Sequence, residues 1–416
     1  MKTLFPKTNR HRRLRLEPLE ERQMLSVSPA EFDAIRAQYP DLNLGEYNSY
    51  NCIDVTNLTG ESLQAAIDLA GNTSVNDLIV VRTTGTNHTI KLSGGELGIN
   101  IDAAEFRGVT IVSFGTDPLI IDAQQQSRVF NIASGSTVAL AGLTMTGGWC
   151  EGETWNGGDG FEYEAFLEYL DSIRYVQDWC GSGILNFGTL TVTGCTITES
   201  SLAQQSGSFP ADLYRSGGGI YNLGALTVTG STISNNAFGI VNGAGSTNVE
   251  NCTITGNQGF GIGLDTGTLT VTGSTITETY GSGILAYGLV ADSTLEVTNC
   301  IITGNYETTM TMQVHSAGIS IGLFNSNYGN PIVSVTAMIT NSVIAGNHCA
   351  GIGYGSDNSD LTTNLTIINC TITGNNAGIL TEWHFHLRCY VKAFKASRSS
   401  ERGLSKIGLD FLPSLA

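Results

Sequence analysis

A repeat of about 20 residues runs through much of this 416-residue chain and restricts its fold more than any other feature. An isoleucine that follows a glycine marks each copy, and successive markers are 36, 20, 22, 22, 35, 33 and 27 residues apart. The markers are Ile184, Ile220, Ile240, Ile262, Ile284, Ile319, Ile352 and Ile379. A basic unit with variable extra length indicates one structural repeat that carries insertions in a loop, which is typical of solenoids.

Each repeat has the alternation of short β-strands. In one copy, Leu226 and Val228 point to one face, and threonines occupy the outward positions. Gly230 supplies a bend, after which Ser231 and Ile233 point inward again. A single copy cannot bury its apolar face, whereas stacked copies pair strand on strand and share one core. The sequence therefore predicts an all-β fold of stacked coils.

One column of the repeat alternates cysteine with serine, two residues before the isoleucine of the second strand. Its members are Cys195, Ser231, Cys252, Ser274, Cys300, Ser342 and Cys370. Stacked coils lie about 4.8 Å apart, so cysteines two coils apart exceed the roughly 7 Å between Cα atoms that a disulfide allows. We therefore expect these four cysteines to be small buried thiols in an interior ladder.

Asparagines recur in a second column, directly after the second strand. They are Asn236, Asn257, Asn305, Asn347 and Asn375. Asparagine tolerates left-handed backbone, and its amide can bond to the asparagine of the next coil. A track of polar groups for a ligand and a structural ladder at a turn both fit this pattern, and we favour the ladder.

The first residues of the predicted solenoid differ from the repeat. Four apolar residues recur at the spacing of one helix face, namely Leu63, Ala66, Ile67 and Ala70. We expect this helix, within residues 57–77, to cap the open edge of the first coil. Short apolar segments then predict strands from residue 78 onward, and the domain is placed at residues 45–380 with its cap included.

Several segments of the chain resemble right-handed parallel β-helix repeat proteins of the pectin-lyase-like fold. They are VTNLTGESLQAAIDLAGNTSVNDLIVV, TIKLSGGELGI, VTIVSFGTDPLIIDAQQQSRVFNIASGSTVALAGLTMTGG and the TLTVTGSTIT units. More narrowly, the chain resembles large secreted bacterial β-helix proteins related to polymorphic outer-membrane proteins. The stretch from Gly217 to Ile220 is similar to their GGAI motif, although the companion FxxN motif is not evident. The resemblance implies a right-handed parallel β-helix of about 12 or more coils.

The two ends lack the repeat. Residues 1–44 are expected to be a leader or targeting segment, largely disordered, and RRLRLEPLEERQMLS within it resembles the leader of planctomycete-type surface proteins. This resemblance implies a location outside the cytoplasm, extracellular or at the cell surface. Residues 381–416 are basic and lose the glycine–threonine rhythm, so we treat them as an atypical tail that a truncation or a frame shift could explain.

An acidic insertion at residues 149–181 interrupts the repeats. It holds eight carboxylates against the single Arg174. A decorated loop is the simpler interpretation, and an acidic flap that binds Ca²⁺ is the alternative. Cys150 and Cys180 flank the insertion and would join its base by a disulfide in an oxidising compartment.

Charge excludes some classes of partner. The chain has a formal net charge of −17, and no Lys or Arg occurs between Ser216 and Thr381. Nucleic acid is therefore not expected as a partner, because phosphate binding needs a basic face. No run of 18 apolar residues is present, so no transmembrane helix is expected.

The sequence contains no strong catalytic motif, and we assign no catalytic, cofactor-binding or metal-binding residues. Polysaccharide lyases need a basic residue beside Ca²⁺-binding carboxylates, and glycoside hydrolases need clustered acids. The acids of the repeats are isolated: Asp265, Glu278, Asp292, Glu296 and Glu307. The candidate bases, none beside an obvious acidic group in the sequence, are Arg82, Lys91, Arg107, Arg128 and Arg215.

The histidines are equally sparse. His384, His386 and Cys389 have the composition of a metal site, but their grouping in the atypical tail is best explained by chance. His315 and His348 lie near turns, where a solvated or hydrogen-bonded role is the default.

We therefore predict a non-catalytic, secreted or cell-surface adhesin, carbohydrate-binding rod or stalk, with a polysaccharide or a cell-surface component as partner. The alternative is a polysaccharide lyase or glycoside hydrolase that acts on an extracellular polysaccharide. Regular repeats with few charges favour the first function over the second. The sequence does not determine the oligomeric state.

Overall fold

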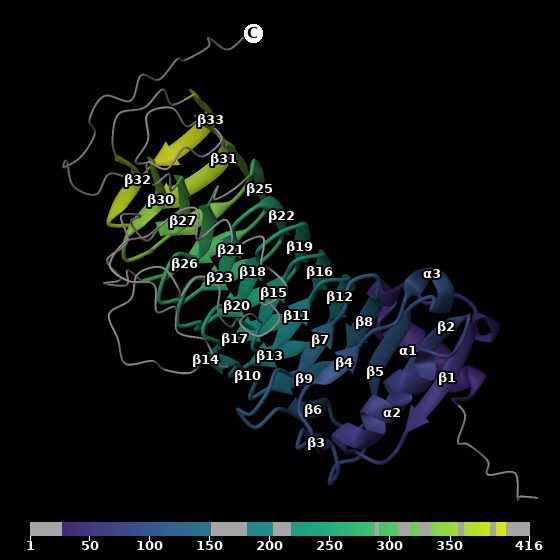
Figure 1. Ribbon diagram of the computed structural model, residues 1–416. Helices are drawn as coiled ribbons and strands as arrows, with labels where there is room; N and C mark the ends of the chain where they lie inside the picture. The colour runs from purple at the N-terminus through teal and green to yellow at the C-terminus, as the bar shows by residue number, and fades with distance from the viewer. Residues whose placement is uncertain are drawn as a thin grey trace, which may run out of the picture.

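The molecule is a rod of stacked coils built from two long parallel sheets (Figure 1). The structure, a computed structural model, describes residues 27–150, 181–202, 218–287, 291–306, 317–323, 334–356, 362–382 and 388–396. One sheet has 21 strands and the other has 10, and the strands of successive coils pair in parallel. The predicted fold, a right-handed parallel β-helix, is confirmed.

The first strand of each coil forms a continuous ladder in the 21-stranded sheet. In order along the rod, its strands are β1 (Tyr50–Val55), β2 (Asn76–Thr83), β5 (Val109–Gly115), β8 (Thr137–Ala141), β12 (Thr189–Thr193), β16 (Ala225–Thr229), β19 (Ser246–Glu250), β22 (Gly267–Thr272), β25 (Ser293–Thr298), β28 (Ser334–Thr340), β31 (Thr362–Thr373) and β33 (Arg388–Ala396). These twelve strands agree with the predicted number of coils.

The second strand of each coil belongs to the same sheet and begins after a short bend. These strands are β3 (Thr89–Lys91), β6 (Leu119–Asp122), β9 (Leu143–Thr146), β13 (Thr196–Thr198), β17 (Thr232–Ser234), β20 (Thr253–Thr255), β23 (Thr275–Thr277), β26 (Ile301–Thr303) and β29 (Val343–Ala345). In the last described coils, the long strand β31 spans both positions.

The third strand of each coil forms the ten-stranded sheet, which closes the coil. Its strands are β4 (Leu97–Ile99), β7 (Phe130–Ile132), β11 (Ile184–Asn186), β15 (Ile220–Asn222), β18 (Ile240–Asn242), β21 (Ile262–Leu264), β24 (Ile284–Tyr287), β27 (Ala317–Leu323), β30 (Ala350–Ser356) and β32 (Ala377–Glu382). Two short strands, β10 (Trp149–Cys150) and β14 (Ser201–Leu202), pair separately.

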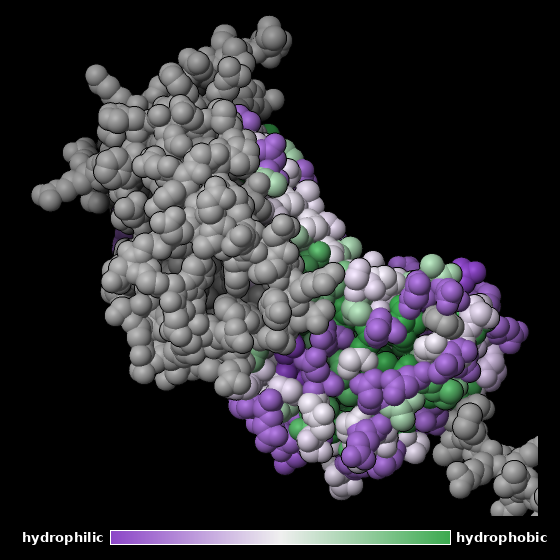
Figure 2. Space-filling view, in the orientation of Figure 1, coloured by the Kyte–Doolittle hydropathy of each residue, from purple (hydrophilic) through white to green (hydrophobic). Residues whose placement is uncertain are grey.

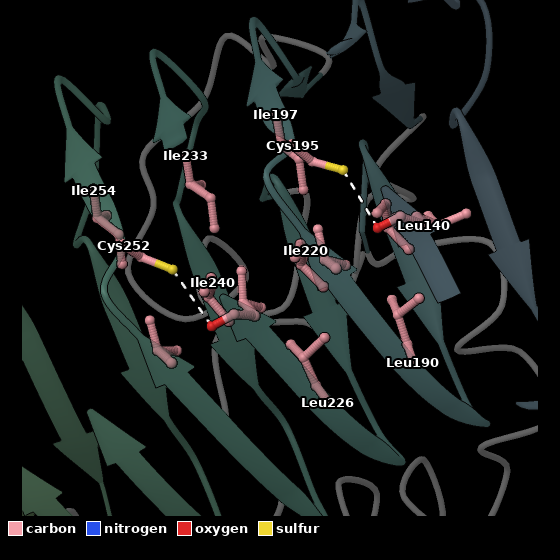
Figure 3. Close-up of a cluster of buried hydrophobic side chains, with 14 of the residues drawn as sticks. Leu140, Leu190, Cys195, Ile197, Ile220, Leu226, Ile233, Ile240, Cys252 and Ile254 are labelled. Atoms are coloured by element: carbon pink, nitrogen blue, oxygen red, sulfur yellow. Dashed lines mark hydrogen bonds between the residues drawn. The ribbon is translucent and has the colours of Figure 1, made fainter. Parts of the chain in front are cut away.

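Identical side chains stack on one another inside the rod. Ile233 pairs in register with Ile197 and Ile254, and all three are fully buried. Figure 3 shows these isoleucines pointing into the same interior as Leu190 and Leu226. Because each coil contributes the same shape at the same height, the core is a set of columns that close-pack along the rod axis.

The cysteine column lies in this interior, as predicted. Cys195 and Cys252 are 2% and 3% exposed, and the serine between them, Ser231, is 2% exposed. Their thiols donate to the carbonyl oxygens of Leu140 (3.5 Å) and Val228 (3.4 Å), and Figure 3 shows both bonds. Burial raises the pKa of Cys195 to about 12. These cysteines are therefore neutral packing groups.

The bend between the first and second strands requires left-handed backbone. Gly194, Gly230 and Gly273 adopt φ of 57°, 54° and 61° there. Asn251 and Asn299 adopt φ of 54° and 55° at the equivalent position. Glycine and asparagine are the residues that tolerate this region, which explains why the repeat alternates between them.

The predicted capping helix is present as α2 (Gly60–Ala70). The hydroxyl of Thr59 accepts a hydrogen bond from the N–H of Ser62 (3.1 Å) and caps its N-terminus. Leu63 and Ile67 are buried against the interior of the first coils. Strand β1, which precedes α2 and pairs with β2, was not predicted, because its sequence is not a copy of the repeat.

The prediction that residues 1–44 are largely disordered is wrong for residues 27–44. They form α1 (Pro29–Gln38) and a 3-10 turn, Pro40–Leu42, and a second 3-10 turn, Tyr47–Ser49, follows. Phe32 and Ile35 are buried against the outer face of the 21-stranded sheet, in one cluster with Leu78, Val80, Val112 and Ala141. Strand β2 is thus covered on both faces, which explains its continuous apolar run.

The coils also continue past residue 380, where the sequence predicts their end. Strand β32 extends to Glu382, and β33 pairs in parallel with β31 from Arg388 onward. The prediction missed this strand because the segment is basic and lacks the glycine–threonine pattern of the repeat. A short helix, α3 (Ala103–Phe106), completes the described elements.

Candidate functional site

At one turn of the coil, a buried polar residue recurs on successive coils, and an exposed residue follows it on several of them. This turn, called here the asparagine turn, leads from the second strand of a coil to the ten-stranded sheet. Its buried positions are Ser200, Asn236, Asn257, Thr279, Asn305, Asn347 and Asn375.

The buried positions form a hydrogen-bonded ladder along the rod. Oδ1 of Asn347 accepts from the main-chain N–H (3.1 Å) and from Nδ2 (2.8 Å) of Asn305. Oδ1 of Asn375 accepts in the same way from Asn347, at 2.9 Å for both bonds. The amides thus satisfy one another and the turn backbone. The predicted ladder is confirmed, and these amides are occupied in holding the turn in register.

On five consecutive coils, the residue after the ladder position is exposed to solvent. These residues are Gln258, Tyr280, Tyr306, His348 and Asn376. We call them the exposed column. Main-chain bonds fix its register, because the N–H groups of Tyr280, Tyr306 and His348 donate to the carbonyl oxygen of the ladder residue on the preceding coil at 2.8–2.9 Å.

The three rings of the exposed column stack along the rod. The ring centroids of Tyr280 and Tyr306 are 5.6 Å apart with an interplanar angle of 26°, and those of Tyr306 and His348 are 4.5 Å apart at 14°. These spacings are those of offset stacks. Tyr280 and Tyr306 remain 56% and 37% exposed. Stacking therefore orders the rings and leaves much of their surface in solvent.

His348 is exposed at a turn, in keeping with the solvated role expected for it. The structure adds a stack with Tyr306 that was not predicted. Sequence reasoning missed the exposed column as a whole. The residues of the column follow the ladder positions but differ in type from coil to coil. They can be recognised in the sequence only when the repeats, which differ in length, are aligned on the asparagines.

The candidate acids do not come together. Glu278 is exposed at the asparagine turn, and Glu296 lies on the outer face of β25. Asp265 is buried after β21, and Asp292 is exposed before β25, where hydrogen bonds from Ser334 lower its pKa. Glu307 lies outside the described residues. The four described acids therefore lie at different positions of their coils.

Two of the candidate bases form ion pairs, and both correct a prediction. Arg82 pairs with Glu31 (2.7 Å) and Asp54 (2.6 Å), and Arg128 pairs with Glu96 (2.8 Å). The expectation that no base sits beside an acidic group is wrong for both arginines, because the partners come from distant segments of the chain.

Of the other bases, Lys91 and Arg107 lie on the N-terminal coils, away from the column. Lys91 is exposed in β3, and Arg107 ends α3 with φ of 65°. Arg215, His315, His384 and His386 lie outside the described residues, whereas Cys389 falls in β33.

The acidic insertion lies outside the described residues from position 151 to 180. Cys150 is buried, and its Sγ lies 3.3 Å from Oγ of Ser182. Cys180 is not among the described residues, so the Cys150–Cys180 disulfide stays a prediction, as does Ca²⁺ binding by the insertion.

Metal-ligand clusters and membrane-spanning helices are both absent from the described residues. These residues contain no group of three metal-ligating side chains. Nor does the described part of the chain include a helix that is long and apolar enough to cross a membrane. In the view of Figure 2, the surface of the N-terminal coils is largely hydrophilic, with apolar residues showing between polar ones.

Comparison with known proteins supports the fold. A family model described as a right-handed β-helix region matches residues 173–336. No curated protein matches the sequence.

Three solved structures illustrate the structural likeness. The A-module of mannuronan C-5 epimerase AlgE4 from Azotobacter vinelandii is 14% identical, with 82% of this chain and 93% of that chain covered and a TM-score of 0.41. Pectate lyase Pel9A is 15% identical, with 86% and 82% covered and a TM-score of 0.38. The tailspike protein gp49 from Acinetobacter baumannii bacteriophage Fri1, a capsular polysaccharide depolymerase, is 11% identical, with 87% and 66% covered and a TM-score of 0.33. At these identities, what the chain shares with these carbohydrate-active proteins is the β-helix fold.

Proposed function

We propose that this protein is an extracellular or cell-surface rod that binds a polysaccharide through the exposed column. The observation that carries the proposal is the run of five solvent-facing, hydrogen-bonding side chains on consecutive coils, three of them stacked rings. The resemblance of the leader to surface-protein leaders supports the location.

The chemistry of the column suits sugars. A sugar ring presents C–H groups on its faces and hydroxyls around its edge. The stacked rings of Tyr280 and Tyr306 still expose apolar ring carbons together with a phenol group, and the amides of Gln258 and Asn376 offer both donors and acceptors. Because stacking and main-chain bonds already order these groups, binding loses little side-chain entropy.

A second candidate function is chemical processing of the bound polysaccharide. The observation that favours it is the position of Glu278, which is exposed two residues before Tyr280 on the same turn. A carboxylate, a phenol and an imidazole are therefore grouped at one turn of neighbouring coils. These are groups that transfer protons in catalysis, and this candidate corresponds to a lyase or a glycosidase.

Affinity gel electrophoresis of the purified full chain against a panel of polysaccharides tests the proposal. We expect retardation by at least one polymer and about fivefold weaker binding for Tyr306→Ala, from the loss of an aromatic contact of about 1 kcal/mol. Met338→Ala, at a 38% exposed residue on the outer face of β28, is the matched control and should bind like the wild type. Equal binding by both variants would contradict the proposal.

The same samples distinguish the two candidates. Unsaturated products, followed by their ultraviolet absorbance, would indicate a lyase, and new reducing ends would indicate a hydrolase. Retardation without product supports a binding rod. Product release that Glu278→Gln abolishes, with binding retained, would establish the second candidate instead.

A further inference from the structure

We infer that the polysaccharide of the exposed column is uncharged and lies along the rod axis with about one sugar per coil. This inference rests on the proposed function and specifies its ligand. Two independent features carry it, the charge of this part of the rod and the spacing of the column.

The coils that carry the column have one sign of charge. Residues 218–382 contain no Lys or Arg and nine carboxylates, at Glu250, Asp265, Glu278, Asp292, Glu296, Glu307, Asp357, Asp360 and Glu382. A polyuronate or a sulfated glycan would approach this region against a repulsive field, and no side chain there supplies a permanent positive charge to pair with it.

A charge close to the column has the same sign. Glu278 is exposed at the asparagine turn, two residues before Tyr280 and on the coil next to Tyr306. Because Glu278 and Tyr280 are two residues apart, their Cα atoms are at most about 7 Å apart, so a ligand carboxylate placed on these rings would lie within the Debye length of about 8–10 Å. An uncharged sugar carries no such penalty, and its hydroxyls can donate to Glu278.

The spacing of the column sets the direction of the polymer. Each coil contributes one column residue, and coils repeat about every 4.8 Å. This rise is close to the length of one hexose in an extended chain, so a polymer parallel to the rod axis meets one side chain per sugar. Five coils then accommodate about five sugars, with Gln258 and Asn376 at the two ends and the rings in the middle.

Isothermal titration with neutral oligosaccharides of increasing length tests the inference. Gluco-, manno- and xylo-oligosaccharides of two to eight sugars are the probes, with oligouronates of the same lengths as the charged comparison, all in the presence of a chelator. We expect affinity for one neutral series to rise with length to about five sugars and then level off. We also expect this affinity to change less than twofold between low and high salt, since no ion pairs form.

Variants at the two ends of the column sharpen the test. Gln258→Ala and Asn376→Ala should each weaken the five-sugar ligand about three- to tenfold and leave the three-sugar ligand within twofold, because short ligands can occupy the rings alone. Met338→Ala should leave both unchanged.

The outcomes separate this inference from the proposed function. Binding of oligouronates in chelator, binding of oligouronates only with added Ca²⁺, or a neutral affinity that is independent of length beyond two sugars would overturn the inference and leave polysaccharide binding intact. If no oligosaccharide or polysaccharide binds, the proposed function itself fails.

Discussion

The asparagine ladder gives a specific prediction for stability. Asn347 is 1% exposed, and its Oδ1 accepts from two N–H groups of Asn305. Its Nδ2 donates to the carbonyl of Ile302 (3.2 Å) and to Oδ1 of Asn375 (2.9 Å). Asn347→Ala removes all four bonds at once and leaves the main-chain N–H of Asn305 buried without this acceptor.

The expected cost follows from these contacts. A buried donor without a partner costs about 1–3 kcal/mol, and each of the three other lost hydrogen bonds contributes about 0.5–1.5 kcal/mol, partly offset where a second partner persists. Asn347→Ala should therefore lower the free energy of unfolding by about 3–5 kcal/mol. Asn248→Ala is the matched control, because Asn248 lies on the outer face of β19, and it should change the free energy by no more than about 0.5 kcal/mol.

Urea unfolding followed by far-ultraviolet circular dichroism measures both variants, with the midpoint shift converted through the slope of the wild type. The reasoning would be refuted if Asn347→Ala cost less than about 1 kcal/mol, or no more than Asn248→Ala. Either result would mean that the ladder amides do not hold the asparagine turn.

Three further predictions concern other features of the fold. Gly230→Asn should be nearly neutral, because Asn251 already adopts the same left-handed bend, whereas Gly230→Val should cost about 1–2 kcal/mol in urea unfolding; equal costs would show that the bend has no such requirement. Native protein at pH 8 should resist iodoacetamide at Cys195, whose pKa burial raises to about 12, and mass spectrometry should find this site alkylated only after denaturation. The hydrogen bonds from Arg82 and Ser28 lower the pKa of Glu31 from 4.5 to about 2, so the contribution of this carboxylate is complete above about pH 4.5 and is lost as the pH falls through about 2. Hydrogen exchange of residues 27–44, corrected for intrinsic rates, should accelerate over that range and stay constant in Glu31→Gln.

Much of the rod could be predicted from the sequence because its coils repeat. Periodic alternation fixes which side of each strand faces inward, and the same small residue at the same height, as at Cys195 and Ser231, identifies an interior column. Glycine or asparagine at the bend, as at Gly230 and Asn251, indicates a left-handed backbone conformation there. In each case a local rule acts identically on every coil.

The parts that sequence reasoning missed depend on contacts between non-repeated segments. Helix α1 packs where the outer face of the sheet is apolar, and the pairing of Glu31 with Arg82 joins residues that are 51 positions apart. The exposed column combines residues of different chemical types from coils of unequal length, so neither composition nor spacing groups Tyr306 with His348. Only the stacking of the coils brings them together.

Side-chain footprinting by hydroxyl radicals tests the central claim most directly. The full chain is oxidised with and without the polysaccharide that retards it in gels, and modification of Tyr280, Tyr306 and His348 is normalised to Met338 on the outer face of β28 in the same sample. We expect bound polymer to protect all three column residues at least severalfold relative to Met338. Protection of Met338 with no protection of the column would place the ligand on the sheet face and contradict the account.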